Sequence, residues 1–139
     1  MGQRIDCIML VDDDMLTNFV NKIVVEDAEV ANHVVRHTSA EAALQYLLDS
    51  SGSAGGLPFP NLIFLDLGMP TVSGWEFINR YKLVKKKFPI QPVIVILTVK
   101  INLKDILDSS NAMEISDLYT KPLTPQIIHN VVNQYCALK

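Results

Sequence analysis

The sequence predicts one α/β domain spanning residues 1–139, built as a doubly wound five-stranded parallel sheet with helices on both faces. Two observations lead to this class. Short apolar runs alternate along the chain with segments whose apolar residues recur at helical spacing. Strands joined by helices form a parallel sheet buried on both faces, and a hydrophobic content of 49% is ample for such a core.

The first strand is predicted at residues 5–11, an apolar run that ends in three aspartates and is typical of a buried strand. Asp14 is expected to cap a helix over residues 15–26. We expect the apolar face of this helix to lie on the core. That face carries Leu16, Phe19, Val20 and Ile23, and the polar face carries Thr17, Asn18, Asn21 and Lys22.

A second strand at residues 32–38 leads into a second helix, which Ser39 opens and which continues to about residue 48. Residues 49–60 are rich in Ser, Gly and Pro, and we expect a flexible surface loop there. The pieces on either side are too small for separate cores, so this loop is placed inside one domain.

The second half of the chain continues the alternation. Strands are predicted at residues 61–65, 92–97 and 115–120. Helices are predicted from Ser73 to residue 84, around residues 103–107, and from a Thr124 cap to residue 135. Trp75 and Phe77 are expected to pack in the core rather than to stack on nucleic-acid bases.

The expected strand order is the flavodoxin-like 2-1-3-4-5, which places ligands beyond the C-terminal ends of the strands. Five candidate side chains gather at those ends: Asp12, Asp13, Asp66, Thr98 and Lys121. Three crowded carboxylates repel one another, and Mg²⁺ suits such hard oxygen ligands. A carboxylate in this setting can attack a phosphoryl group, while a lysine and a hydroxyl bind the phosphoryl oxygens.

The motifs around these residues resemble the receiver domain of two-component response regulators over essentially the whole chain. They are LVDDD at 10–14, FLDLGMPTVSG at 64–74, the apolar strand that ends in Thr98, and the pair Lys121–Pro122. The resemblance implies that Asp66 is the phosphoacceptor, Thr98 the switch hydroxyl and Lys121 the phosphoryl-contacting lysine. It implies Mg²⁺ ligands from Asp12, Asp13, Asp66 and the backbone carbonyl of Gly68, and a cis bond before Pro122.

The resemblance also implies partners. A histidine kinase or a histidine phosphotransfer protein would supply the phosphoryl group, and an output protein would bind the switched surface. That surface would comprise the fourth helix, the fifth strand and the last helix, including Leu107, Leu118 and Tyr119, and homodimers could form through it. The domain would be no enzyme beyond its own autocatalytic phosphorylation and dephosphorylation. The chain would signal by protein contact, or it would be a fragment of a longer regulator or hybrid kinase.

Two features depart from the family pattern, the pair Leu118–Tyr119 and Val99. Leu118 stands where the family usually has an aromatic residue, and Tyr119 is expected to point to the opposite face of its strand, which puts the aromatic switch in doubt. Val99 replaces a small residue after Thr98 and predicts slow phosphorylation by small donors. Lys100 is expected to shield the phosphoryl group from water and slow its loss.

Charge and composition disfavour several other functions. The net charge is −3, and the cluster Lys85–Lys87 is expected to be a solvated helix end, so nucleic-acid binding has little support. Cys7 and Cys136 are not in a redox or metal-ligand spacing, and no apolar segment is long enough for a membrane span or a signal peptide. We therefore expect a cytoplasmic protein. The histidines at 33, 37 and 129 do not converge on one site.

Two alternatives remain open from the residues alone. A phosphohydrolase would use a nucleophile after the first strand and an acid two residues later, and Asp12 and Asp14 match that spacing loosely. A degenerate receiver would bind partners without being phosphorylated, against which the complete set of acidic residues, Thr98 and Lys121 argues.

Overall fold

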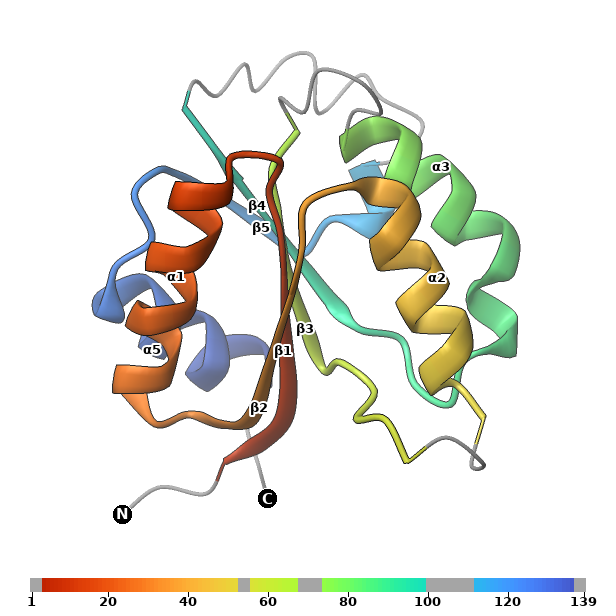
Figure 1. Ribbon diagram of the computed structural model, residues 1–139, viewed down its shortest axis with the longest axis horizontal. Coiled ribbons are helices and arrows are strands. Elements are labelled where there is room, and N and C mark those ends of the chain that lie inside the picture. Colours follow the sequence, from red (N-terminus) through yellow and green to blue (C-terminus); the bar gives the residue numbers. More distant parts are fainter. Residues whose placement is uncertain (1–3, 53–55, 68–73, 100–111, 137–139) are drawn as a thin grey trace.

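The computed structural model describes residues 4–52, 56–67, 74–99 and 112–136. It contains a five-stranded parallel sheet in the order β2-β1-β3-β4-β5, which confirms the predicted class and strand order (Figure 1). The strands are β1 (Ile5–Val11), β2 (Ala31–His37), β3 (Leu62–Leu65), β4 (Val93–Thr98) and β5 (Asp117–Thr120). The helices are α1 (Met15–Ala28), α2 (Ala40–Ser50), α3 (Gly74–Val84) and α5 (Pro125–Tyr135), with 3₁₀ turns at Lys85–Lys87 and Ala112–Glu114.

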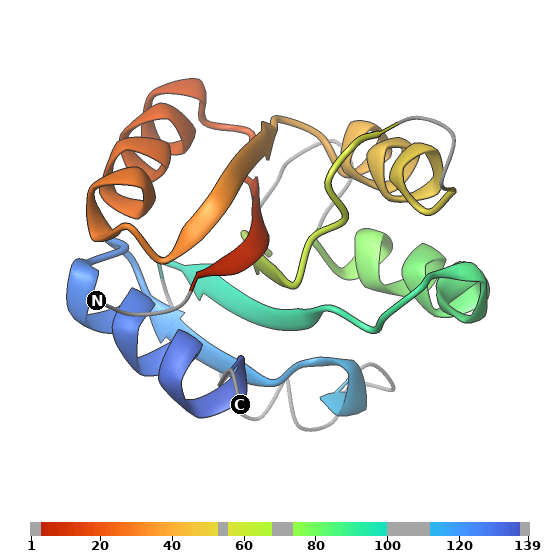
Figure 2. The same cartoon turned by 90° about the horizontal axis from the view of Figure 1, so that it is seen from below.

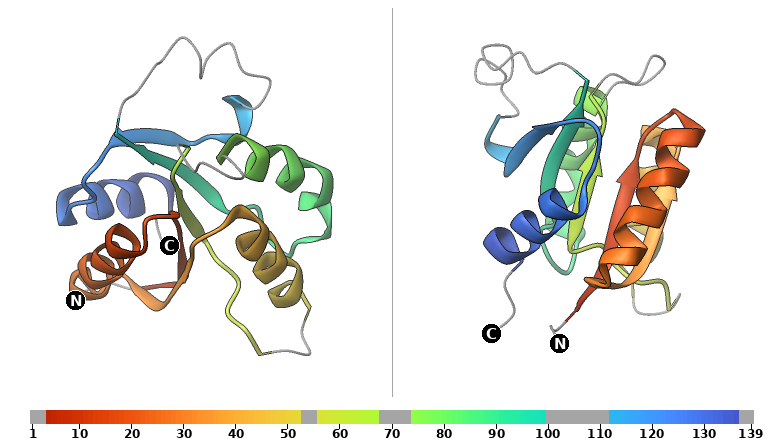
Figure 3. Two further views of the ribbon diagram at one scale, coloured as in Figure 1. Left: turned by 45° about the horizontal axis from the view of Figure 1, so that its top comes forward. Right: turned by 90° about the vertical axis from the view of Figure 1, so that its left-hand side faces the viewer.

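Two helices cover each face of the sheet in the described part of the chain. Helices α1 and α5 lie on one face and α2 and α3 on the other (Figures 1, 2 and 3). Successive strand residues point to opposite faces, so Met9 and Val11 pack under α2 and α3 while Ile8 and Leu10 pack under α1 and α5. The central strands are therefore apolar on both faces, as a doubly covered sheet requires.

Short polar side chains begin three of the helices as predicted. The side chains of Asp14, Ser39 and Thr124 accept hydrogen bonds from backbone N–H groups in the first turns of α1, α2 and α5. Helix α1 ends at Ala28 and is capped by Glu29, whose φ of 55° is left-handed, a conformation that glycine adopts more easily. These local signals set where the helices start and stop, and with them the length of each crossover.

The predicted orientation of α1 is wrong. Asn18, Asn21 and Val25 face the sheet, whereas the apolar residues expected in the core are exposed, with Leu16 at 71% and Phe19 at 46%. The physical reason lies at the start of the helix. The Asn18 amide hydrogen-bonds to carbonyl groups at the ends of β1 and β2, which turns the asparagine face inward. Only the later residues of that face, such as Val25, pack apolar surface on the sheet.

Several predicted boundaries also change. Helix α2 continues through Ser50, so the predicted loop at 49–60 starts too early. Its later part is packed, since the Tyr46 hydroxyl donates to the Pro58 carbonyl at 2.7 Å and the Phe59 ring contacts that of Phe88. Strand β5 starts at Asp117 rather than residue 115, because a 3₁₀ turn precedes it.

Other predictions fall in or next to undescribed parts of the chain. The helix around 103–107 lies outside the described residues, as does its predicted surface residue Leu107. Ser73, the predicted start of α3, also lies outside them. Within the described ranges no helix is both long and apolar enough to cross a membrane. Cys7 and Cys136 are free thiols.

Candidate functional site

The parallel register brings the predicted site residues to one edge of the sheet. Val11 of β1 is opposite Leu65 of β3, and the Asp66 N–H donates to the Val11 carbonyl at 3.0 Å, so Asp12 and Asp66 follow neighbouring strand ends. On the other side of the site, the Lys121 N–H donates to the Thr98 carbonyl at 2.8 Å. This edge is at the top of Figure 1.

Three carboxylates form a cluster at this edge. Asp12, Asp13 and Asp66 each offer an oxygen, and these oxygens lie within 4.8 Å of one another. Asp12 and Asp66 are buried and Asp13 is half-buried. Such a set of hard oxygen donors fits a divalent cation. The predicted fourth ligand, Gly68, lies outside the described residues.

Lys121 provides the positive charge of the cluster. Its Nζ donates to Asp12 at 2.7 Å and to Asp66 at 3.3 Å. The Lys121–Pro122 peptide bond is cis, which confirms that prediction. With all four groups ionised, three negative charges face one positive charge, and the cluster keeps two negative charges for a cation to neutralise.

Burial and ion pairing act in opposite directions on the pKa values of Asp12 and Lys121. Burial raises the pKa of the Asp12 carboxyl above its usual value, and the hydrogen bond from Lys121 only partly offsets this. Burial also lowers the pKa of Lys121, but the hydrogen bond and the charge of Asp12, with the charge of Asp66, outweigh it and raise that pKa overall. Lys121 is therefore a permanent cation at neutral pH.

Asp14 does not take part in the cluster. Its carboxylate is exposed and accepts hydrogen bonds from the Thr17 N–H and hydroxyl, which caps α1. These bonds hold the pKa of Asp14 below its usual value, so it is a poor proton donor. Because the hydrolase alternative needs Asp14 as its acid, this geometry argues against it.

Helix α3 begins directly against the strand end that carries Asp66. A Cβ built on Gly74 would lie 2.6 Å from the Asp66 carbonyl oxygen and 2.8 Å from the Leu67 Cα. Both are backbone atoms that cannot move aside as a flexible side chain could. Only glycine permits this approach of α3 to β3.

Two hollows adjoin the cluster. One is a cavity of about 10 Å³ behind the carboxylates, whose lining includes Asp12, Asn21 and Asp66. The other is a groove of about 430 Å³ between α1 and the start of the β5–α5 connection, lined by Leu16, Thr17, Val20, Asn21, Lys121 and Pro122. The groove is mainly apolar and reaches the lysine of the cluster.

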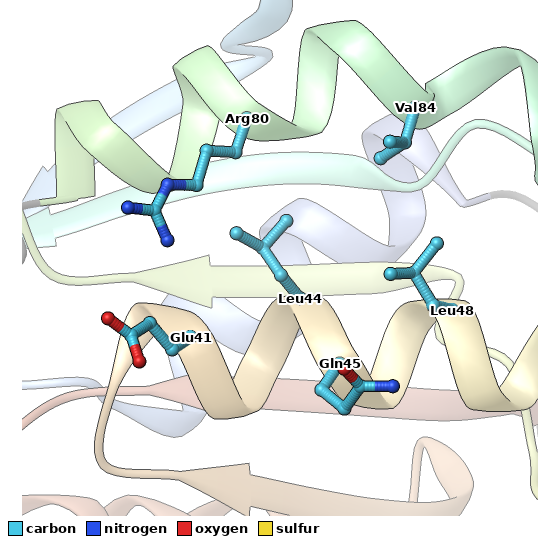
Figure 4. A pocket seen from close by; sticks show the side chains of 6 residues that line it. All are labelled: Glu41, Leu44, Gln45, Leu48, Arg80 and Val84. Carbon is cyan, nitrogen blue, oxygen red and sulfur yellow. The ribbon is translucent and has the colours of Figure 1, made fainter.

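A third hollow lies between α2 and α3 and holds none of the predicted site residues. Its volume is about 350 Å³, and Leu44 and Leu48 of α2 face Arg80 and Val84 of α3 across it (Figure 4). Glu76 pairs with Arg80 at 3.2 Å on the α3 side. The hollow belongs to the opposite face of the sheet from α1, so we do not assign it to the carboxylate cluster.

Sequence reasoning missed Asn18 and Asn21 at this site. Both are buried in the N-terminal half of α1, next to the carboxylates, yet they were predicted to be on the polar face away from the core. Their spacing with Val25, at i, i+3 and i+7, was a signal for one shared face. The larger number of apolar residues on the other face led to the prediction that the other face is buried.

The remaining sequence predictions concern side-chain packing. Leu118 and Tyr119 pack against opposite faces of the sheet, as expected. Phe77 is part of the core, and the partly buried Trp75 packs against it. The Lys85–Lys87 cluster forms a 3₁₀ turn after α3, with Lys85 paired to Glu114 at 2.9 Å.

The fold and the charged cluster place this protein in a class: doubly wound α/β domains whose functional site lies at the C-terminal ends of the sheet strands. The family model of the response regulator receiver domain matches residues 8–133, and the chain belongs to this family. Domains of this family are signalling modules of two-component systems. A search of curated protein sequences gave no match.

Solved structures agree with this assignment. The crystal structure of a two-component response regulator from Cytophaga hutchinsonii is similar with a TM-score of 0.80 and 26% identity, over 95% of this chain and 97% of that one. A response regulator receiver protein from Dyadobacter fermentans has the same fold, with a TM-score of 0.78, 22% identity and coverage of 95% and 98%. The phosphorylated cyanobacterial phytochrome response regulator RcpA has a TM-score of 0.70, 23% identity and coverage of 96% and 95%.

Proposed function

We propose that this receiver domain accepts a phosphoryl group on the carboxylate of Asp66. The observation that carries the proposal is the Lys121 Nζ, which lies 3.3 Å from Asp66 and 2.7 Å from Asp12 in a cluster of three carboxylates. A cation within reach of the attacking oxygen can bind the incoming phosphoryl oxygens. That one structure of similar fold is of a phosphorylated response regulator supports this reading.

The chemistry is a transfer between two nucleophiles. An Asp66 oxygen attacks phosphorus, a P–O bond forms, and the P–N bond of a phosphohistidine donor breaks. Its electron pair goes to the imidazole nitrogen, which then takes a proton. Lys121 binds the phosphoryl oxygens, and the Thr98 hydroxyl is proposed as a further donor.

Mg²⁺ is the proposed cofactor, with Asp12, Asp13 and Asp66 as side-chain ligands and the Gly68 carbonyl as a further one. The three oxygen donors and the two net negative charges of the cluster fit a hard divalent cation. When bound, Mg²⁺ would reduce the charge that opposes the approach of a phosphoryl group.

The test is phosphorylation by a small donor. The protein is incubated with acetyl phosphate and Mg²⁺, and the intact mass is measured. We expect one added phosphoryl group, none in Asp66→Asn, and none when Mg²⁺ is chelated. Addition to Asp12, or continuous release of phosphate without a stable adduct, would favour a hydrolase. No adduct under any condition would favour a receiver that works without phosphorylation.

We further propose that the phosphodonor, a histidine kinase or a histidine phosphotransfer protein, docks on the α1 apolar surface, defined by Met15, Leu16, Phe19, Val20 and Ile23. Five of the eleven large apolar side chains exposed in the described residues lie there. The surface starts one residue after Asp14 and continues into the groove that ends at Lys121. A donor that reaches Asp66 from the side of α1 would cover this border, and an exposed apolar patch is typical of a protein contact.

Charge substitutions test the docking proposal. Leu16→Asp should slow transfer from a panel of phosphorylated histidine phosphotransfer proteins by about tenfold or more, because it places a charge in the contact. Its rate with acetyl phosphate should be unchanged. Leu83→Asp is the matched control, since Leu83 is 84% exposed on α3. Equal transfer rates for Leu16→Asp and the parent would contradict the proposal.

The output partner is proposed to bind elsewhere. The expected face includes β5, where Leu118 and Tyr119 are half-buried, and α5. Homodimers through this face and a cytoplasmic location remain predictions. Amide exchange over residues 98–125, with and without the phosphoryl group, tests whether phosphorylation changes this face, and an identical pattern in both states would contradict the proposal.

A further inference from the structure

The start of α1 buries a polar side chain that apolar packing does not explain. Asn18 is fully buried, and its Nδ2 donates to the Asp12 carbonyl at 3.0 Å and to the His37 carbonyl at 2.8 Å. These carbonyls end two neighbouring strands, β1 and β2. An uncharged side chain with two N–H protons can satisfy both, whereas a hydroxyl has one proton and a carboxylate has none. The chemistry of the contact therefore favours an amide.

The arrangement carries two unfavourable features. Asn18 Oδ1 is buried and has no hydrogen-bond partner among the described residues. The same helix leaves Leu16 and Phe19 exposed, although one of these could have been buried in its place. A buried acceptor without a partner disfavours folding. A helix selected only to pack on the sheet would not carry both features, so the amide serves another purpose.

The hydrogen bonds of Asn18 act on the backbone of the acidic pair. The Asp12 N–H donates to the His37 carbonyl at 3.2 Å, and the Asp12 carbonyl accepts from Asn18, so Asp12 is held at both ends. The Asp14 N–H in turn donates to the Asp12 carboxylate at 3.0 Å. The peptide group between Asp12 and Asp13 is thereby held, and with it the direction of the Asp13 side chain.

We infer that Asn18 is a positioning residue, which orients the Asp12 and Asp13 carboxylates for cation binding by tying their backbone to the end of β2. This inference rests on the proposed function, in which these carboxylates bind Mg²⁺. Among the described residues, Asn18 itself donates only to backbone carbonyls, and it is not among the proposed ligands. Groups that orient metal ligands in this way commonly change affinity when they are removed.

The test separates positioning from simple stability. Asn18→Leu removes both donors and the unpaired oxygen, and Val25→Ala is the control because Val25 is buried on the same face of α1, two turns further on. Mg²⁺ binding to the metal-free proteins is measured by calorimetry, well below each melting temperature. We expect affinity about tenfold or more weaker in Asn18→Leu and unchanged in Val25→Ala. Parent-like affinity in Asn18→Leu would overturn the inference.

A second measurement does not depend on Mg²⁺. Amide exchange of Asp12 and Asp14 in the metal-free protein should be faster in Asn18→Leu than in Val25→Ala. Equal exchange would overturn the inference, whatever the metal result. If the parent binds no Mg²⁺, the proposed function fails, and the exchange result still decides whether Asn18 holds this backbone. Asn18→Ala, which leaves room for water at both carbonyls, replaces the leucine variant if that does not fold.

Discussion

Repulsion among the clustered carboxylates should lower the stability of the metal-free protein, so the Asp13→Asn variant should be more stable than the parent. The substitution keeps the shape of the side chain and removes one charge from within 4.8 Å of two other carboxylates. Two unit charges 4.8 Å apart, the upper limit of this range, repel by about 3.5 kcal/mol at an effective dielectric constant of about 20, and by about 0.9 kcal/mol in water. Asp13 is half-buried and Lys121 attracts it, so we expect a net gain of about 1–2 kcal/mol.

Thermal unfolding in a chelator measures this gain. For a domain of this size the melting temperature should rise by about 3–8 °C, and added salt should reduce the difference. Asp14→Asn is the control, because it removes a charge from the same acidic run while asparagine still caps α1. It should not stabilise the protein.

Adding Mg²⁺ should reverse the order of stability. At a concentration about 100 times the dissociation constant, binding stabilises the parent by about 2.7 kcal/mol, whereas Asp13→Asn loses a ligand and gains less. If Asp13→Asn is no more stable than the parent in the chelator, the electrostatic reasoning about the cluster is wrong.

Three further predictions concern stability away from the carboxylates. Glu29→Gly should stabilise the protein by about 1 kcal/mol in urea unfolding, because φ is 55° there, and Glu29→Ala should not. Burial lowers the pKa of His37 below 6.5, so the stability it contributes above that pH is lost as pH falls through its folded pKa. Between about pH 7 and pH 5, His37→Phe should therefore lose less stability than the parent. Phe77→Ala should cost about 3–5 kcal/mol, measured by urea unfolding, since Phe77 is fully buried; a loss below about 1 kcal/mol would contradict its place in the core.

The strand order and the position of the site were predictable because they depend on local patterns. Apolar runs that end in Asp12, Asp66 or Thr98 identify strands and their C-terminal ends together. In a parallel sheet those ends meet at one edge, so residues distant in sequence come together without further information. The helix caps were equally local, as Asp14 and Thr124 show.

The orientation of α1 was not predictable in this way because it depends on hydrogen bonds across the fold. Counting apolar residues selects the face with Leu16 and Phe19, and on most helices that face is the buried one. Here Asn18 pairs with carbonyl groups of two strands, one of which lies 19 residues further along the chain. Periodicity groups Asn18 with Asn21 and Val25 on one face, but it does not show that this face contacts the strand ends.

The packing of the later part of the predicted 49–60 loop was missed for a similar reason. Pro58 and Phe59 lie in a stretch whose Ser, Gly and Pro content indicates a surface loop. Tyr46 on α2 and Phe88 after α3 supply the partners that hold it, and neither is near it in sequence. Composition describes the backbone preferences of a segment but not the side chains that the fold places beside it.

The contact of Gly74 with the backbone of Asp66 and Leu67 limits which amino acids position 74 can accept. A methyl group at that position would meet main-chain atoms at 2.6 and 2.8 Å, so even alanine must displace α3 from the strand end that carries Asp66. In a saturation library of residue 74 selected for folded protein, glycine should be recovered almost alone. At Gly52, where an added Cβ meets open space, the same selection should accept most residues. At these two glycines, tolerance to substitution should thus follow how closely an added Cβ approaches backbone atoms.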